Sequence, residues 1–151
     1  MKLAEALILR ADYQKRIEQV KKRIILSVKI QEGEKPPEDA ENLITELNTL
    51  YEQLTELVQK INKTNSLTVF QGGKSLTDVL AERDKYALKR DALTSIVEAA
   101  SIRQDRYTKS EVKYIRMVDV AEIQRRIDHL AKEYRTLDTQ IQEANWKTEV
   151  L

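Results

Sequence analysis

Three arginines and one lysine are the residues of this sequence best suited to binding a small anion. Arg83 and Arg90 fall on the apolar stripe of a predicted helix, where a guanidinium needs a carboxylate or a ligand anion as its partner. Lys74 stands at the start of that helix, and Arg106 lies in a polar stretch beyond it. Two interpretations stay open: internal ion pairs, or a site for a small anion or phosphate ligand.

The segment Gly73-Lys74-Ser75 is similar to the end of a phosphate-binding P-loop, in which backbone N–H groups surround a phosphate and a lysine meets its outer oxygens. The match is incomplete, because Thr68 stands where the full motif has glycine. Nucleotide hydrolysis and anion binding are the functional alternatives here. We favour a plain turn followed by a helix cap.

Two further groups of polar residues are candidates for ligand contact. Asn62 and Asn65 lie near the end of the second predicted helix, where capping accounts for most such residues. His129, with Glu122 and Glu133, has the helical spacing of metal ligands, but three ligands from one helix seldom suffice. We therefore predict an exposed histidine, no metal site and no cofactor.

The amino-acid composition excludes several fold classes and kinds of site. The 151 residues include 34% charged and 41% apolar residues, with only three Gly and two Pro. So few turn formers favour helices over a sandwich or barrel. The 26 basic and 25 acidic residues exclude a global polycation, and without cysteine no disulfide or thiolate site can form. No apolar span approaches 20 residues, so we expect a soluble, cytoplasmic protein.

The periodicity predicts one domain over residues 1–151: an all-α, antiparallel four-helix bundle of coiled-coil hairpins with a small β cap. The predicted elements are helices at about 2–31, 39–65, 76–101 and 120–145, and short strands at about 66–70, 111–118 and 147–151.

The second and fourth predicted helices carry apolar seams with alternating steps of four and three residues. We expect both seams to face a shared dry interior. Residues 1–31 hold eight Lys/Arg against three Asp/Glu, whereas residues 32–58 hold one Lys against eight acids, which favours pairing of the first two helices. The seam residues are Leu43, Leu47, Leu50, Leu54, Leu57 and Ile61, and then Val120, Ile123, Ile127, Leu130, Tyr134, Leu137, Ile141 and Ala144.

Several strings of residues, taken together, resemble a bacterial family of small helical proteins without established function, labelled septicolysin-like. The resemblance spans the chain and carries no catalytic residue. Its label implies a cytolysin-like, membrane-active protein. However, the apolar seams are narrow and their flanks densely charged, which favours packing of the helices against one another over binding to lipid. The strings are Met1–Leu7, Gln31–Glu34, Ile61–Asn65, Leu80–Asp84, Arg106–Glu111 and Ile141–Trp146.

The function that these features favour is a non-enzymatic helical interaction or scaffold protein that forms a homo-oligomer through its leucine-type seams. A small-anion-binding protein, with possible enzyme activity, and a membrane-active cytolysin are the alternatives. Nucleic-acid binding is not expected, because the acidic second helix cancels much of the field of the basic first one. Neither the protein partner nor the number of subunits follows from the sequence.

Overall fold

A computed structural model describes residues 1–101 and 113–151, and within them the chain is all-α, as predicted. The elements are α1 (Leu3–Ser27), α2 (Ala40–Leu67), the short 3₁₀ helix η1 (Gln71–Gly73), α3 (Leu76–Ala100) and α4 (Val120–Lys147).

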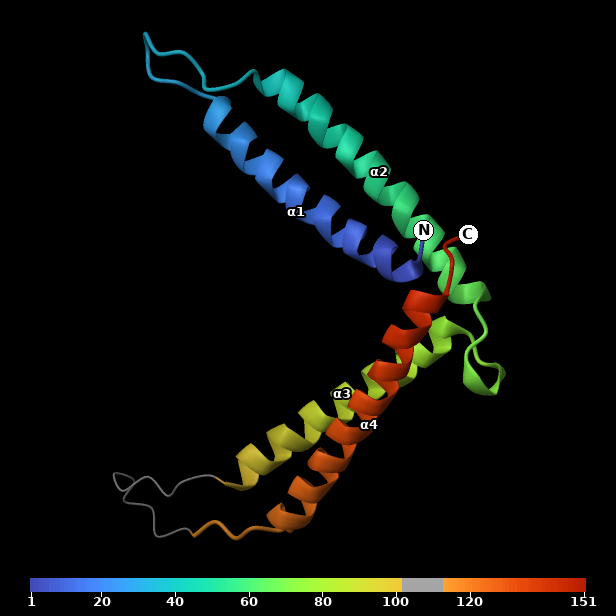
Figure 1. The fold of residues 1–151 in the computed structure, drawn as a ribbon. Helices are drawn as coiled ribbons and strands as arrows, with labels where there is room; N and C mark the ends of the chain where they lie inside the picture. Colours follow the sequence, from blue (N-terminus) through green and yellow to red (C-terminus); the bar gives the residue numbers. More distant parts are fainter. Residues whose placement is uncertain (102–112) are drawn as a thin grey trace. The chain divides into compact units, whose positions relative to one another are not determined.

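The chain divides into two compact units. Met1–Thr77 and Gln142–Leu151 form the first unit, and Asp78–Ile141 forms the second. The main body of each unit is an antiparallel helix pair, α1 with α2 in the first and α3 with α4 in the second (Figure 1).

Apolar side chains that face one another hold the α1–α2 hairpin together. Ile17 and Val20 of α1 pack with Leu43 and Leu50 of α2, and all four are at least nine-tenths buried. α1 ends at Ser27, before the predicted end near residue 31, and the apolar residues Val28 and Ile30 that follow it are exposed.

Side-chain caps set where two of the helices begin. The Asp39 carboxylate accepts a hydrogen bond of 3.1 Å from the backbone amide of Asn42, which starts α2. Asp119 does the same for the amide of Glu122 at the start of α4, also at 3.1 Å. Both caps agree with the sequence signals.

The predicted β cap is replaced by a junction of chain ends in the first unit. The described residues contain no sheet, only two isolated β-bridges, Lys2 with Glu149 and Val69 with Ser75. The strand expected at 66–70 does not form, because α2 continues to Leu67 and only Val69 makes a β-bridge. Residues 113–118 contain no strand, and 111–112 lie outside the described residues.

Hydrogen bonds tie this junction together. The amide of Leu3 donates to the carbonyl of Thr148 at 2.8 Å, and the amide of Val150 donates to the carbonyl of Met1 at 2.9 Å. The amide of Leu151 donates to Oγ1 of Thr64, a fully buried residue of α2, at 3.1 Å. The residues expected as the strand 147–151 therefore pair with the N-terminus and α2, rather than with another predicted strand.

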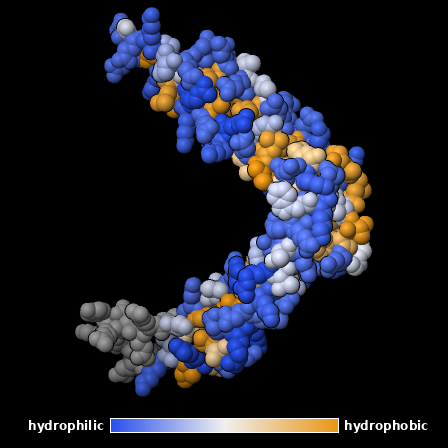
Figure 2. All heavy atoms as spheres, viewed as in Figure 1, coloured by the Kyte–Doolittle hydropathy of each residue, from blue (hydrophilic) through white to orange (hydrophobic). Residues whose placement is uncertain are grey.

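The surface of the molecule is mostly hydrophilic in the view of Figure 2, with hydrophobic residues reaching the surface in separate patches. Among the described residues, no helix is long and apolar enough to cross a membrane.

Candidate functional site

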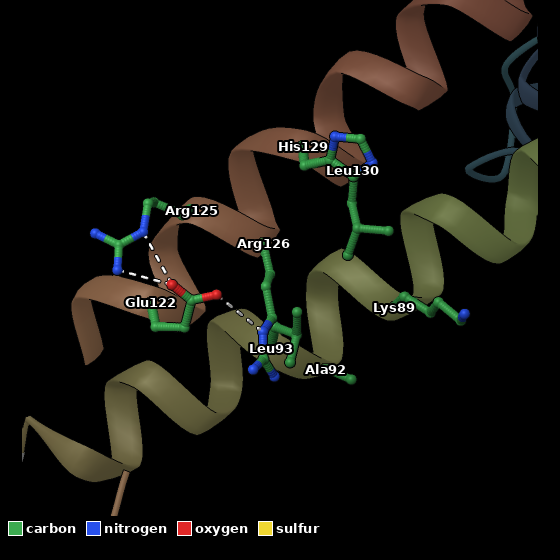
Figure 3. Close-up of a pocket in the computed structure, with 8 residues that line it drawn as sticks. All are labelled: Lys89, Ala92, Leu93, Glu122, Arg125, Arg126, His129 and Leu130. Atoms are coloured by element: carbon green, nitrogen blue, oxygen red, sulfur yellow. Dashed lines mark hydrogen bonds and ion pairs between the residues drawn. The ribbon is translucent and has the colours of Figure 1, made fainter. Parts of the chain in front are cut away.

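A groove lies between α3 and α4, within the second unit (Figure 3). Its volume is about 570 Å³, within the range of small-ligand and peptide sites. We call it the basic groove. It is lined by Lys89, Ala92 and Leu93 of α3 and by Glu122, Arg125, Arg126, His129 and Leu130 of α4.

Helical spacing explains the floor of the basic groove. Leu93 and Leu130 belong to the facing seams of α3 and α4, and both remain half-buried. Two helices alone cannot enclose the seam between them, so its apolar side chains stay open along the groove. The floor is therefore apolar.

Cations dominate the rim of the basic groove. Arg125 donates to Oε2 of Glu122 at 2.7 Å, and Arg126 Nε lies 3.6 Å from the other carboxylate oxygen. These cations, Arg125 first, hold the pKa of Glu122 below its usual value. With Lys89 on the α3 side, three permanent cations face one carboxylate, and the rim is net positive.

The arginine pair singled out from the sequence lies elsewhere along the α3–α4 seam. Arg83 donates to Asp138 at 2.9 Å and to Asp84 at 3.1 Å, and it lies over the Tyr134 ring at 5.8 Å from the centroid. Burial alone would lower the pKa of Arg83, but hydrogen bonds to Asp138 and Asp84 outweigh it and raise this pKa. Arg90 lies 5.8 Å from the same ring centroid.

Arg90 has a weaker carboxylate partner than Arg83, because its Nε lies 3.7 Å from Oδ1 of the adjacent Asp91. Both arginines thus form ion pairs within the protein and cation–π contacts with Tyr134. Their role as an anion site stays a prediction.

Three of the other predicted ligand residues, Lys74, Asn62 and Asn65, belong to the first unit, whereas these arginines belong to the second. Lys74 follows η1 in a closed turn, where its carbonyl accepts a bond of 2.7 Å from the Phe70 amide. Asn62 is exposed and Asn65 half-buried near the end of α2, where the Asn62 carbonyl accepts from the Ser66 hydroxyl. Arg106 lies outside the described residues.

Backbone groups of the P-loop-like segment form hydrogen bonds within the turn itself. The amide of Gly73 donates to the carbonyl of Phe70 at 3.2 Å, and the amide of Leu76 donates to the carbonyl of Thr68 at 2.9 Å. Amides engaged in this way do not surround a phosphate. The geometry supports a turn leading into α3.

His129 is an exposed rim residue whose Nε2 lies 4.0 Å from a carboxylate oxygen of Glu133. No group of three potential metal ligands forms among the residues that the structure describes. The described lining of the basic groove also contains no hydroxyl nucleophile beside His129. The arrangement suits recognition of an acidic, partly apolar surface.

Sequence reasoning missed the basic groove, although one signal was available. Arg125, Arg126 and His129 stand close together in the sequence and flank the seam position Leu130. Several cationic residues next to an apolar seam that one helix only partly covers are the pattern that could have located the basic groove.

The fold and site define an all-α protein built from helical hairpins, with a cationic interhelical groove. Residues 10–150 match the model of a family described as a family of unknown function, DUF6847, and the chain belongs to that family. The chain is also similar to a solved structure described as a functionally unknown conserved protein from Corynebacterium diphtheriae. The sequence identity is 41%, the TM-score is 0.92, and the match covers 100% of this chain and 99% of that one.

These comparisons correct the resemblance drawn from short strings. The family shown is DUF6847, and neither it nor the similar solved structure is described as septicolysin-like. The septicolysin assignment is therefore wrong, and the cytolysin alternative loses the label on which it depended. No curated protein matches the chain.

Proposed function

We propose that this protein is a helical interaction or scaffold protein that self-associates through an apolar edge of α2. The supporting observation is the width of the apolar stripe on this helix. Residues seven apart lie nearly on one line of an α-helix. Three such lines on α2 are apolar, and we call the third of them the α2 edge. The lines are Leu43–Leu50–Leu57, Leu47–Leu54–Ile61 and Ile44–Tyr51–Val58.

Burial distinguishes the three lines. The line through Leu50 is buried against α1, and Leu47 and Leu54 pack beside that core. On the α2 edge, Ile44 is 36% exposed and Tyr51 is 45% exposed. A single partner helix covers a seam two lines wide, so a third line calls for a further helix. A second molecule can supply that helix.

Sedimentation velocity over a range of protein concentrations tests this proposal. The wild type is expected to shift from a smaller to a larger species as concentration rises. Tyr51→Glu places a charge on the α2 edge without touching the buried line, and it is expected to weaken this association. Gln53→Glu, on another face of the same helix, is the matched control. A wild type that stays monomeric at every concentration would overturn the proposal.

The small-anion alternative has less support, because Arg83 is already held by Asp138 and Asp84. The cytoplasmic location, the absence of enzyme activity and the absence of nucleic-acid and membrane partners also stay predictions.

A further inference from the structure

We propose that the α2 edge of one molecule docks in the basic groove of a second molecule, so that two unlike surfaces form the contact. This inference rests on the self-association proposed above and names the surfaces involved. Each surface is apolar at its centre. Cations surround the floor of the basic groove, whereas Glu41 and Glu52 follow one side of the α2 edge and Lys21 of α1 lies within coulombic range of Tyr51 on it.

Carboxylates follow one side of the α2 edge, where Glu41 and Glu52 remain after Glu46 pairs with Arg23 and Glu56 with Lys60. Residues 40–59 include four glutamates and no lysine or arginine. Glu41 precedes Ile44 by one helical turn, and Glu52 directly follows Tyr51. Neither Glu41 nor Glu52 is in an ion pair with any described residue, so both carboxylates are available to a partner.

The basic groove offers the complementary arrangement. Leu93 and Leu130 form an apolar floor, and Lys89, Arg125 and Arg126 stand around it. In Figure 3 the Arg126 side chain reaches from α4 toward Leu93 on α3, across the groove. A carboxylate arriving beside Arg126 would meet a cation that its intramolecular partner, Glu122, holds only at 3.6 Å.

The dimensions of the two surfaces agree. The groove lining on α4 runs from Glu122 to Leu130, about 12 Å along the helix axis. Ile44 and Tyr51 are seven residues apart, which is about 10 Å along α2. The spacing of the two apolar anchors of α2 therefore matches the length of the groove lining on α4.

Charge argues against the pairings of like surfaces. Two α2 edges brought together would oppose their glutamates, and two basic grooves would oppose their arginines. Placing the edge in the groove converts both repulsions into attraction and covers both apolar centres.

A charge-swap experiment tests the docking. Glu52→Arg and Arg126→Glu are each expected to raise the dissociation constant for self-association by about tenfold or more. An equimolar mixture of the two variants is expected to recover association, because the variant edge and variant groove are again opposite in charge. Sedimentation velocity measures association, and fluorescent labelling of one variant distinguishes mixed from single-variant species.

Control variants separate docking from general charge effects. Gln53→Arg on α2 and Arg135→Glu on α4 change charge away from both surfaces and are expected to associate as the wild type does. Far-ultraviolet circular dichroism and thermal melting confirm that every variant folds. A variant that fails this check is replaced by Glu52→Gln or Arg126→Gln, for which we expect a smaller weakening.

The outcomes distinguish the two proposals. A wild type that associates together with swap variants that associate equally well would overturn the docking and leave self-association standing. Weakening by Arg126→Glu without recovery in the mixture would also overturn it, since Arg126 would then contribute to self-association without Glu52 as its partner. A monomeric wild type would overturn self-association itself.

Discussion

Arg83 of α3 and Asp138 of α4 are joined by a hydrogen bond of 2.9 Å between Nη1 and Oδ1, although they are 55 residues apart in the sequence. Arg83 is 22% exposed and Asp138 is 32% exposed, so water screens the pair only in part. A guanidinium on an apolar seam thereby obtains its carboxylate from the facing helix, which holds the two helices in register.

The Arg83–Asp138 pair is expected to couple the two residues energetically. Asp138→Asn should destabilise the protein by about 1–3 kcal/mol, because it weakens a charge-assisted hydrogen bond to a partly buried cation. The double variant Arg83→Leu/Asp138→Leu should cost less than the sum of its two single variants. Urea unfolding of the wild type, Arg83→Leu, Asp138→Leu and the double variant measures this coupling. Strict additivity would show that the pair contributes no interaction energy.

Truncating a side chain in the core of the α1–α2 hairpin is expected to lower the stability of the protein strongly. Leu50 is 7% exposed and packs with the α1 core, so Leu50→Ala should cost about 2–5 kcal/mol. Leu88 of α3 is 70% exposed, and Leu88→Ala should change stability by less than about 0.5 kcal/mol. Thermal melting followed by circular dichroism compares the two variants. Equal losses of stability for Leu50→Ala and Leu88→Ala would contradict the assignment of Leu50 to the core.

The contact between the chain ends is expected to depend on pH. Hydrogen bonds from Lys2 and from the amino group of Met1 hold the pKa of Glu149 below its ordinary value of 4.5. A carboxylate with a lowered pKa stabilises the folded state above its unfolded pKa, and this contribution is lost as pH falls through the folded value. The chain ends should therefore loosen below a pH of about 4.5.

The amide signal of Val150, which donates to the carbonyl of Met1, reports this loosening in an NMR titration. In Glu149→Gln the signal should already be shifted at neutral pH and should lose its acidic transition. Glu143→Gln removes only an exposed pair with Lys147 within α4 and serves as the control. An unchanged transition in Glu149→Gln would contradict the assignment.

The turn before α3 requires a residue with positive φ. Gly73 has a φ of +78°, and a Cβ added there would meet no atom within 4 Å. The cost of Gly73→Ala is therefore backbone strain alone, about 1–2 kcal/mol. Gly73→Asn should cost less, because asparagine tolerates this conformation better. Equal losses of stability for Gly73→Ala and Gly73→Asn in urea unfolding would show that backbone strain at position 73 is not the cause.

The helical fold could be predicted because its signals are local. Steps of three and four apolar residues, together with capping residues such as Asp39 and Asp119, define helices within a short stretch of sequence. The β cap could not be predicted in this way. Residues 148–150 bond to Met1 and Leu3 at the other end of the chain, and no local pattern reveals that partner.

The candidate site was predicted less well than the fold. The sequence showed that Arg83 and Arg90 would need partners, but it could not choose between Asp138 and a ligand anion, because that choice depends on the register of α3 against α4. The basic groove depends on the same register, which places Lys89 opposite the cations of α4. The α2 edge was already present as the repeat of Ile44, Tyr51 and Val58, but burial was needed to show that it stays open.

The hydrogen bond between Val150 and Met1 has a practical consequence for protein engineering. A short glycine linker could join the two ends without stretching the junction, and new ends could be opened in the exposed connection between α1 and α2. Such a circular permutant would keep every described helix intact while making that connection the point of attachment for a label or a fusion partner.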